Sequence, residues 1–350
     1  MRMTDTAVPG AALSRAYWER VVRPLLARHR PGLAVAAARL GSGSDVLGFD
    51  DAQSRDHDWG LRLTLLVEHG CAEEVDALLE RELPESWEGL PTRFATTWEP
   101  VVRQRAEVAA AADFVASRTG IAASRLTAPE GLELGDWLSL TGQAVLEVTA
   151  GPVFHDGPGV LGGLRERLSW YPRDVWLYAL AADWHRLGQE FPDVGRAGLR
   201  GDEDGSAVIA ARHVRTMLHL AHLLHRTWPP YGKWLARSAA RLPGGGVLRL
   251  ALADVLQARH WRGRQTALAE AAELLAAVQR AQGLPAPEPA TEGFFDRPHV
   301  GLRDLPGPLL ALVEDEQVAA LPAGVGTAEQ ISDNVTVLVD PVARRRLVGG

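Results

Sequence analysis

The sequence predicts an α+β protein, in which a mixed sheet with flanking helices is followed by a mainly helical domain. Short apolar runs alternate with amphipathic helical stretches over about the first 160 residues. From Leu161 onward the apolar positions recur at helical spacing and strand patterns nearly vanish. At 350 residues the chain exceeds the usual size of one hydrophobic core, so more than one domain is expected.

The elements follow in order. Apolar spacing predicts a helix over residues 11–30, after which GLAVAAARL leads into a glycine-serine turn. LRLTLLV is typical of a buried strand, AEEVDALLERELP of an amphipathic helix, and EVAAAADFVASRTG of a further segment on the same sheet. QAVLEVTAGPVFHDG is interpreted as two strands joined by a turn at Ala150 and Gly151.

Three domains or segments are predicted. Residues 1–160 form an α/β domain and residues 161–280 a helical domain. Residues 281–350 begin with the linker GLPAPEPATEG and continue as a C-terminal segment that packs on the helical domain.

Composition excludes several classes of protein. No run approaches the about 20 apolar residues that span a bilayer, so we expect no membrane partner. The net charge of -7 argues against extended nucleic acid as a partner, because that needs a clustered basic face. The single Cys71 and the absence of a signal-like N-terminal apolar core predict a cytoplasmic protein.

The stretch GSGSDVLGFDDAQSRDHDWG carries the candidate chemistry. Asp56 and Asp58 would project from one face of a strand and reach a common Mg²⁺ ion, which proteins hold through one or two carboxylates and nucleotide phosphates. Eleven residues separate Ser44 from Asp56, which is enough for a turn that returns beside the acids. Backbone N–H groups at Gly43 and Ser44 could then bind phosphate oxygens. The alternative is a solvated acidic turn.

The arrangement of Gly-Ser, a spacer of about ten residues and Asp-x-Asp resembles the signature of the polymerase-β-like nucleotidyltransferase superfamily. Much of the chain is also similar to an uncharacterised nucleotidyltransferase-like family common in actinobacteria. The segments that carry this resemblance are GSGSDVLGFDDAQSRDHDWG, DWLSLTGQAVLEVTAGPVFHDGPG, LRERLSWYPRDVW, WPPYGKW and RPHVGLRDLP.

The resemblance implies a nucleotidyltransferase-like sheet and a substrate hydroxyl that attacks the α-phosphate of a nucleoside triphosphate, with ATP as the expected donor and Mg²⁺ as cofactor. Gly43 and Ser44 would hold the triphosphate, and Asp56 and Asp58 would be the catalytic metal ligands. The superfamily also has a third carboxylate on a neighbouring strand. Four residues are candidates for it: Glu107, Asp136, Glu147 and Asp156.

Other polar residues have competing interpretations. Lys233, the only lysine, follows two prolines at a predicted helix start and could reach the triphosphate. His219, His222 and His225 recur every three residues, a spacing that drifts around a helix and does not favour a metal site. Three arginines could line a phosphate pocket or pair with acids such as Glu166 and Asp202, and we favour pairing: Arg165, Arg167 and Arg196.

The sequence therefore predicts a Mg²⁺-dependent nucleotidyltransferase that moves a nucleoside monophosphate to a hydroxyl of a small molecule or a protein. The alternative is a non-catalytic nucleotide-binding or regulatory module with a degenerate site. A third possibility is an antitoxin-like protein that adenylylates a toxin.

Overall fold

The structure is a computed structural model that describes residues 9–55, 59–97 and 99–349. The chain divides into two compact units. The first unit contains Met1–Leu132 and Ala144–Ser169, and the second contains Glu133–Gln143 and Trp170–Gly350. A mixed sheet with flanking helices in the first unit and a mainly helical second unit confirm the predicted α+β class.

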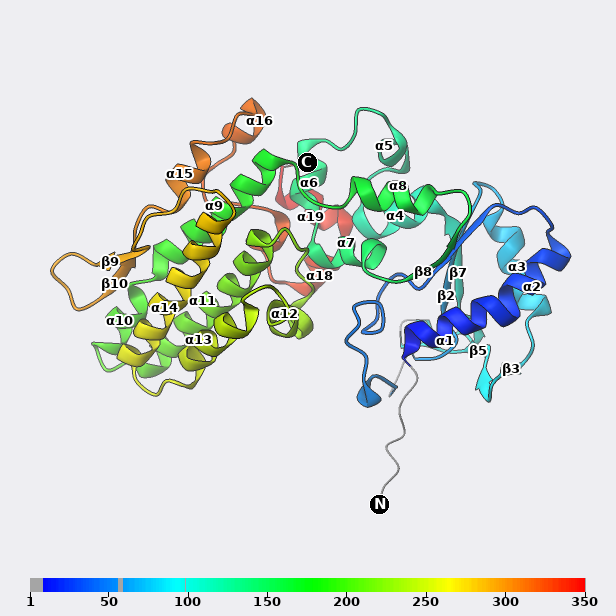
Figure 1. Ribbon diagram of the computed structural model, residues 1–350, viewed down its shortest axis with the longest axis horizontal. Helices are drawn as coiled ribbons and strands as arrows, with labels where there is room; N and C mark the ends of the chain where they lie inside the picture. Colours follow the sequence, from blue (N-terminus) through cyan, green and yellow to red (C-terminus); the bar gives the residue numbers. More distant parts are fainter. Residues whose placement is uncertain (1–8, 56–58, 98, 350) are drawn as a thin grey trace, which may run out of the picture. The chain divides into compact units, whose positions relative to one another are not determined.

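The first unit is built on a four-stranded sheet in the order β7-β2-β1-β8, of which Figure 1 labels β2, β7 and β8. β1 pairs antiparallel with β2 and with β8, whereas β7 runs parallel to β2. Every residue of the two central strands is buried, which explains their continuous apolar sequences. The strands are β1 (Val35–Ala38), β2 (Leu63–Val67), β7 (Ala106–Ala110) and β8 (Val153–Asp156).

The apolar side chains on one face of this sheet pack against the N-terminal helices and α3. Tyr17, Val22 and Leu26 recur at helical spacing and join Leu63 and Leu65 in the same core cluster. The helix predicted over residues 11–30 is confirmed, with a π-helical turn in its middle. These elements are α1 (Gly10–Tyr17), η1 (Trp18–Val22), α2 (Arg23–His29) and α3 (Ala72–Glu82).

The remaining helices of the first unit pack on the sheet and on one another. α4 contacts β2 and β7, and α8 contacts β8 and α4. Short ladders join β3 to β4 and β5 to β6. The elements are η2 (Ala52–Arg55), β3 (Ser86–Trp87), β4 (Leu90–Pro91), β5 (Arg93–Phe94), β6 (Arg103–Gln104), α4 (Ala111–Thr119), α5 (Ala123–Thr127) and α8 (Val160–Arg167).

The prediction of two strands in QAVLEVTAGPVFHDG was wrong in its first half. That half is the helix α7 (Gly142–Thr149), and only β8 after it is a strand. Val145 and Val148 are fully buried three residues apart, as on one helix face. Burial of that face outweighs the strand preference of the β-branched residues.

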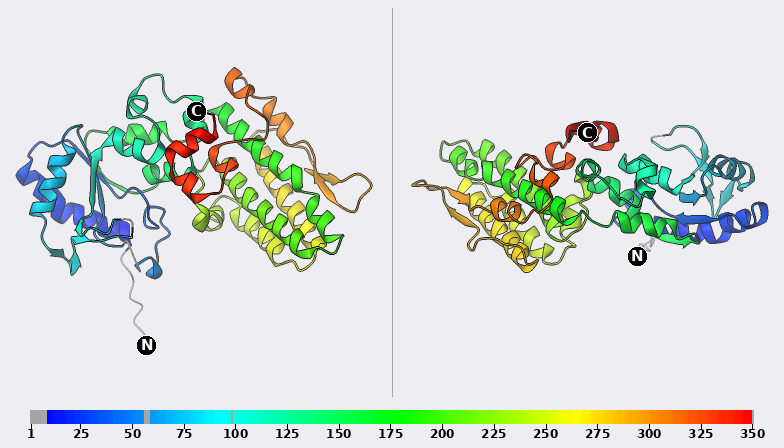
Figure 2. Two further views of the ribbon diagram at one scale, coloured as in Figure 1. Left: turned by 180° about the vertical axis from the view of Figure 1, so that it is seen from behind. Right: turned by 90° about the horizontal axis from the view of Figure 1, so that it is seen from above.

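The second unit is a helical bundle with a long C-terminal extension (Figure 2). α11 contacts α9, α13 and α14, and these helices lie alongside one another. The elements up to this point are α6 (Leu134–Ser139), α9 (Arg173–Glu190), α10 (Asp193–Gly198), α11 (Glu203–Leu224), α12 (Gly232–Ala239), α13 (Gly245–Gln257) and α14 (Trp261–Ala281). None of the helices in the described residues is both long and apolar enough to cross a bilayer.

The C-terminal extension packs on this bundle through several short elements. α15 and α16 contact α9, and α19 contacts α6. The extension contains β9 (Thr291–Gly293), β10 (Val300–Leu302), α15 (Pro306–Leu310), α16 (Glu316–Ala319), α17 (Ala328–Ile331), α18 (Val335–Val339) and α19 (Pro341–Leu347).

A buried polar cluster ties the extension to the bundle. His219 Nδ1 on α11 lies 2.6 Å from Asp183 Oδ2 on α9, and His219 Nε2 lies 3.5 Å from Glu329 Oε1 on α17. Glu329 also accepts the N–H of Gly142 at 3.0 Å, and Gln330 donates to Asp183 at 2.8 Å. Burial alone would lower the pKa of His219, but the two carboxylates raise it to about 10. The imidazolium is therefore charged at neutral pH.

We expect this imidazolium to make the stability of the second unit depend on pH. The folded pKa is about 10, whereas an unfolded histidine titrates near its ordinary value of 6.5. The stabilisation is therefore complete below about pH 6.5 and is lost as the pH rises through about 10. In urea unfolding at pH 6, His219→Gln should lower the free energy of unfolding by about 3 kcal/mol, because two buried carboxylates lose their cation. The difference should shrink toward pH 10.

His260→Gln is the matched control, since the His260 side chain is 85% exposed. It should leave the unfolding free energy within about 0.5 kcal/mol of the wild type at each pH. An unchanged pH dependence in His219→Gln would contradict the role assigned to the ion pairs.

Candidate functional site

A glycine turn, residues 41–44, leaves the end of β1 at the edge where β2 and β7 begin. Gly41 and Gly43 have φ angles of 81° and 146°, which residues other than glycine rarely adopt. A Cβ atom on Gly43 would lie 2.3 Å from Asp45 Oδ1 and 2.7 Å from Arg39 Nη2. The turn can therefore have no side chain at this position.

Arg39 and Asp45 hold the turn from inside. The Arg39 side chain is 3% exposed and pairs with both oxygens of Asp45, at 2.7 and 3.0 Å. The same guanidinium donates to the carbonyl of Ser42 at 3.0 Å and to the carbonyl of Leu40. Because these carbonyls are bound to a buried cation, the shape of the turn is set before any ligand arrives. The sequence analysis did not identify this pair; its signal is an arginine directly between a buried strand and the glycines.

Three successive N–H groups of the turn are available to a ligand. Within the described ranges, no hydrogen bond is donated by the backbone of Ser42, Gly43 or Ser44. The neighbouring N–H of Gly41 binds the carbonyl of Glu147 on α7 at 2.8 Å. Successive unbonded N–H groups at a glycine turn form a concavity that suits an anion.

The sheet register places a carboxylate beside the turn. Thr64 on β2 is paired with Ala38 on one side and with Glu107 on β7 on the other, so these three side chains share one face of the sheet. The Thr64 hydroxyl accepts the N–H of Leu40 at 3.2 Å. A Cβ atom on Gly41 would be 3.9 Å from Glu107 Oε2. Glu107 therefore lies next to the glycine turn.

Asp56 and Asp58 lie outside the described residues. The described chain resumes at Trp59. β2 begins at Leu63, and this start of β2 lies at the same edge of the sheet as the glycine turn. Within the described residues, no group of three or more His, Cys, Asp or Glu side chains could hold a metal ion.

The four candidates for a third carboxylate occupy different places. Glu107 and Glu147 both pair with Arg118, at 2.6 and 3.7 Å, beside the glycine turn. Asp156 on β8 accepts the N–H of Gly162 at 2.9 Å. Asp136 belongs to the second unit, where it accepts the N–H of Glu133 and pairs with Arg345. Of the four, only Glu107 is on the strand next to β2.

Lys233 belongs to the second unit, whereas the glycine turn belongs to the first. It lies in the first turn of α12, as the two prolines predicted, and its side chain is exposed. Its ammonium group is 5.0 Å from the centre of the Trp234 ring. Within the first unit, the guanidinium of Arg118 lies beside the glycine turn.

The helical histidines have structural partners. His222 Nδ1 lies 2.7 Å from the carbonyl oxygen of Leu218 and Nε2 lies 3.0 Å from the Ser238 hydroxyl. Burial lowers the pKa of His222 to about 4, so this ring is neutral at pH 7. His219 is held in the same way by its contacts with Asp183 and Glu329.

The three arginines considered for a phosphate pocket also have partners, mostly backbone carbonyls. Arg165 donates to the carbonyls of Val148 at 2.9 Å and Gly151 at 2.5 Å. Arg167 donates to the carbonyl of Ala128 at 2.6 Å. Arg196 pairs with Asp193, its neighbour on α10, at 2.6 Å. Pairing was the favoured prediction, although the acceptors differ from the acids named in it.

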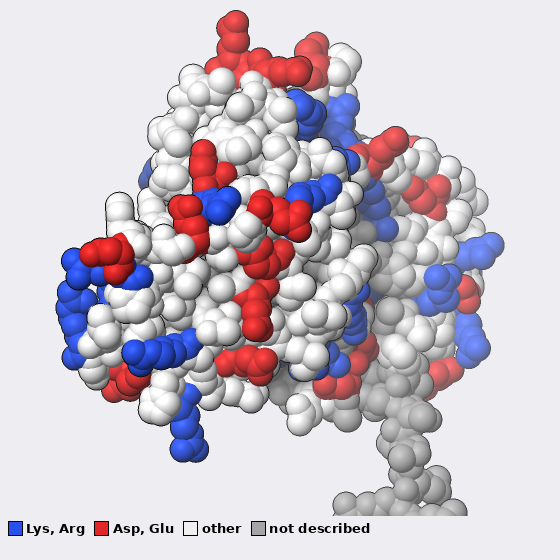
Figure 3. Space-filling view, turned by 60° about the vertical axis from the view of Figure 1, so that its left-hand side comes forward, with Lys and Arg blue, Asp and Glu red and all other residues white. Residues whose placement is uncertain are grey.

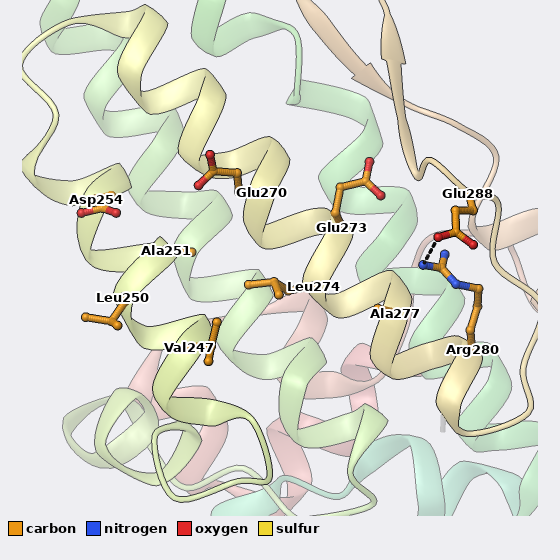
Figure 4. Close-up of a pocket in the computed structure, with 10 residues that line it drawn as sticks. All are labelled: Val247, Leu250, Ala251, Asp254, Glu270, Glu273, Leu274, Ala277, Arg280 and Glu288. Carbon is orange, nitrogen blue, oxygen red and sulfur yellow. Dashed lines mark ion pairs between the residues drawn. The ribbon is translucent and has the colours of Figure 1, made fainter.

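A groove of about 630 Å³ lies along α13 and α14 in the second unit (Figure 4). Val247, Leu250 and Leu274 contribute apolar side chains to it, and several carboxylates surround them. One of these, Glu273, accepts the N–H groups of Ala290 and Thr291 at 2.9 Å, and the pKa of Glu273 is lowered because these bonds outweigh its burial. Acidic and basic side chains are intermixed on the face in Figure 3. The groove contains none of the residues of the glycine turn.

Comparison with known proteins gives a family match for part of the chain. Residues 137–235 match the model of a family described as "Domain of unknown function (DUF4037)". No curated protein matches the sequence. The chain is also similar to the crystal structure of a nucleotidyltransferase-like protein from Exiguobacterium sibiricum 255-15, with 12% identity, 77% of this chain and 75% of that chain covered, and a TM-score of 0.31. The family match includes Lys233 and His219 but not the glycine turn.

Proposed function

We propose that the protein is a Mg²⁺-dependent nucleotidyltransferase that moves the nucleoside monophosphate of ATP, or of another nucleoside triphosphate, to a hydroxyl of a small molecule or a protein. One observation carries the proposal: the glycine turn, whose N–H groups at residues 42–44 have no hydrogen-bond acceptor among the described residues, lies beside Glu107 at the edge where β2 begins. The segment that leads into β2 contains Asp56 and Asp58.

The proposed cofactor is a magnesium ion, and the chemistry of the carboxylates supports this choice. Carboxylate oxygens are hard ligands of the kind Mg²⁺ prefers, and Mg²⁺ usually also takes oxygens from nucleotide phosphates. Glu107 has the access this requires, because its side chain is 46% exposed. Asp56, Asp58 and Glu107 would hold the metal, which would screen the charge of the triphosphate when bound.

The chain contributes binding, orientation and a proton acceptor. The N–H groups of residues 42–44 would hold phosphate oxygens, and Arg39 keeps these groups in position. The acceptor oxygen then forms a bond to the α-phosphorus while the bond from that phosphorus to the pyrophosphate oxygen breaks. The proton of the acceptor hydroxyl passes to Glu107, which is the described carboxylate closest to the turn on the neighbouring strand.

A second candidate function is supported by one contact. Both oxygens of Glu107 are bound by the guanidinium of Arg118. If this pairing persists when nucleotide binds, Glu107 can neither ligate a metal nor accept a proton. The protein would then be a nucleotide-binding module without turnover.

The test is the release of labelled pyrophosphate from γ-³²P-labelled nucleoside triphosphates, with a panel of hydroxyl acceptors and with the protein itself as acceptor. We expect release by the wild type to require Mg²⁺ and to stop with EDTA. Glu107→Gln should lower the rate by about 100-fold, the usual size of a general-base effect. Glu68→Gln, which changes an exposed residue just after β2, should stay within about twofold.

Calorimetric titration with Mg²⁺ and the non-hydrolysable analogue AMPCPP separates the two candidates. Binding together with pyrophosphate release supports the transferase. Binding without release for any nucleotide or acceptor supports the binding module. Neither binding nor release would overturn both.

A further inference from the structure

Arg118, near the end of α4, is a second cation at the glycine turn, besides the buried Arg39. Its Nη2 atom is 2.6 Å from Glu107 Oε2, and its Nε atom is 3.7 Å from Glu147 Oε2. The guanidinium carbon lies 4.9 Å from the centre of the Phe114 ring. The side chain is 26% exposed, so the guanidinium is held on several sides but can be reached from solvent.

Arg118 also lies directly against the turn itself. A Cβ atom on Gly41 would be 3.6 Å from Arg118 Nη2. An anion bound by the N–H groups of residues 42–44 would therefore be a near neighbour of a positive charge. Guanidinium groups match phosphate oxygens through parallel N–H donors, which makes arginine well suited to this position.

The ion pair between Arg118 and Glu107 opposes metal binding at Glu107. One guanidinium nitrogen, Arg118 Nη2, donates to both oxygens of Glu107, the carboxylate that the neighbouring strand places beside the turn. A divalent cation that approached Glu107 would also be repelled by the guanidinium at short range. The structure therefore shows Glu107 in a state in which a metal has to compete with Arg118.

We propose that Arg118 is a phosphate-sensing gate: it holds Glu107 until a nucleoside triphosphate binds, and then exchanges the carboxylate for the phosphate oxygens. This inference rests on the proposed function. The exchange replaces the ion pair between Arg118 and Glu107 by one between Arg118 and the phosphate. Glu147 is a second carboxylate near Arg118, and it keeps the guanidinium beside the turn. Glu107 is then released for the metal, so triphosphate and metal bind with positive coupling.

The gate predicts that removal of Arg118 changes two affinities in opposite directions. In Arg118→Gln, Glu107 loses its competitor, so Mn²⁺ added without nucleotide should bind about tenfold tighter in titrations followed by electron paramagnetic resonance. The same variant should bind AMPCPP, measured by calorimetry without divalent metal, about tenfold more weakly. Arg118→Lys keeps the positive charge but loses the parallel N–H donors of the guanidinium. It should therefore shift the Mn²⁺ and AMPCPP affinities in the same directions as Arg118→Gln, by a smaller factor.

Arg20→Gln is the control, because Arg20 is an exposed arginine that pairs with Glu88 at 3.1 Å. Both of its affinities should equal those of the wild type. A decrease or no change in Mn²⁺ affinity for Arg118→Gln, and likewise for Arg118→Lys, would overturn the gate even if the wild type is an active transferase. If the wild type binds AMPCPP and its Mn²⁺ affinity equals that of Arg118→Gln, the proposed nucleotide site is supported and the gate is rejected. If the wild type binds neither Mn²⁺ nor AMPCPP, both the gate and the proposed function are rejected.

Discussion

Replacing Asp56 and Asp58 together by asparagine will lower pyrophosphate release from ATP by at least about 1000-fold, because both changes remove charged metal ligands. Asparagine has nearly the same size as aspartate but lacks the charge that neutralises a cation. The loss should appear in kcat at saturating Mg²⁺ and ATP, measured in single-turnover experiments. AMPCPP binding without metal should change little, since the glycine turn is intact.

Asp51→Asn provides the control from the same loop. Asp51 caps η2 by accepting the N–H of Gln53 at 3.0 Å, and it is exposed. This variant should retain activity within about twofold. Full activity of the double asparagine variant would mean that these carboxylates do not hold the catalytic metal. Thermal melting of each variant shows whether a loss of activity reflects unfolding.

The largest effect on stability is expected from Gly151→Ala. A Cβ atom at Gly151 would lie 1.8 Å from the carbonyl oxygen of Arg39, which is backbone and cannot rotate away. The N–H of Arg39 is also bound to the carbonyl of Pro152 at 3.0 Å, so any shift separates β1 from β8. We expect a loss of about 4–5 kcal/mol in the free energy of unfolding, measured by urea titration, together with loss of AMPCPP binding.

Gly163→Ala is the matched change in the same unit. Gly163 lies inside α8, and nothing is within 4 Å of a Cβ atom placed there. Alanine should therefore stabilise the helix by about 0.5–1 kcal/mol. Equal effects of the two substitutions would show that the close approach of Gly151 to Arg39 does not control the stability of this edge.

Local patterns were sufficient for the elements that bury one continuous apolar surface. The run at β2 is buried at every residue, and the helix over residues 11–30 buries Tyr17, Val22 and Leu26 on one side. These elements could be predicted because periodicity and burial agree in them. The segment at Val145 and Val148 was predicted wrongly, because its β-branched residues favour a strand and only the packing of one buried face makes it a helix.

The candidate site was predictable in part, for a similar reason. The glycine-serine turn and the Asp-x-Asp segment are adjacent along the chain, so their spacing can be read from the sequence. The sequence left four candidates for the third carboxylate and proposed Lys233 as the cation. Glu107 is separated from the turn by many residues, and no local pattern specifies which distant residues return to it, while the role of Lys233 stays a prediction.

By itself, the sequence determined the α+β class, the order of a buried strand, a glycine turn and an acidic segment, and the helical character of the second half of the chain. Only the tertiary structure decided that Glu107 lies beside the turn, that Arg118 is a nearby cation, and that Arg39 and Asp45 brace it. The register that pairs Thr64 with Glu107 joins residues far apart in sequence. It is set by how whole faces of strands and helices are buried, and this depends on all the packed elements together.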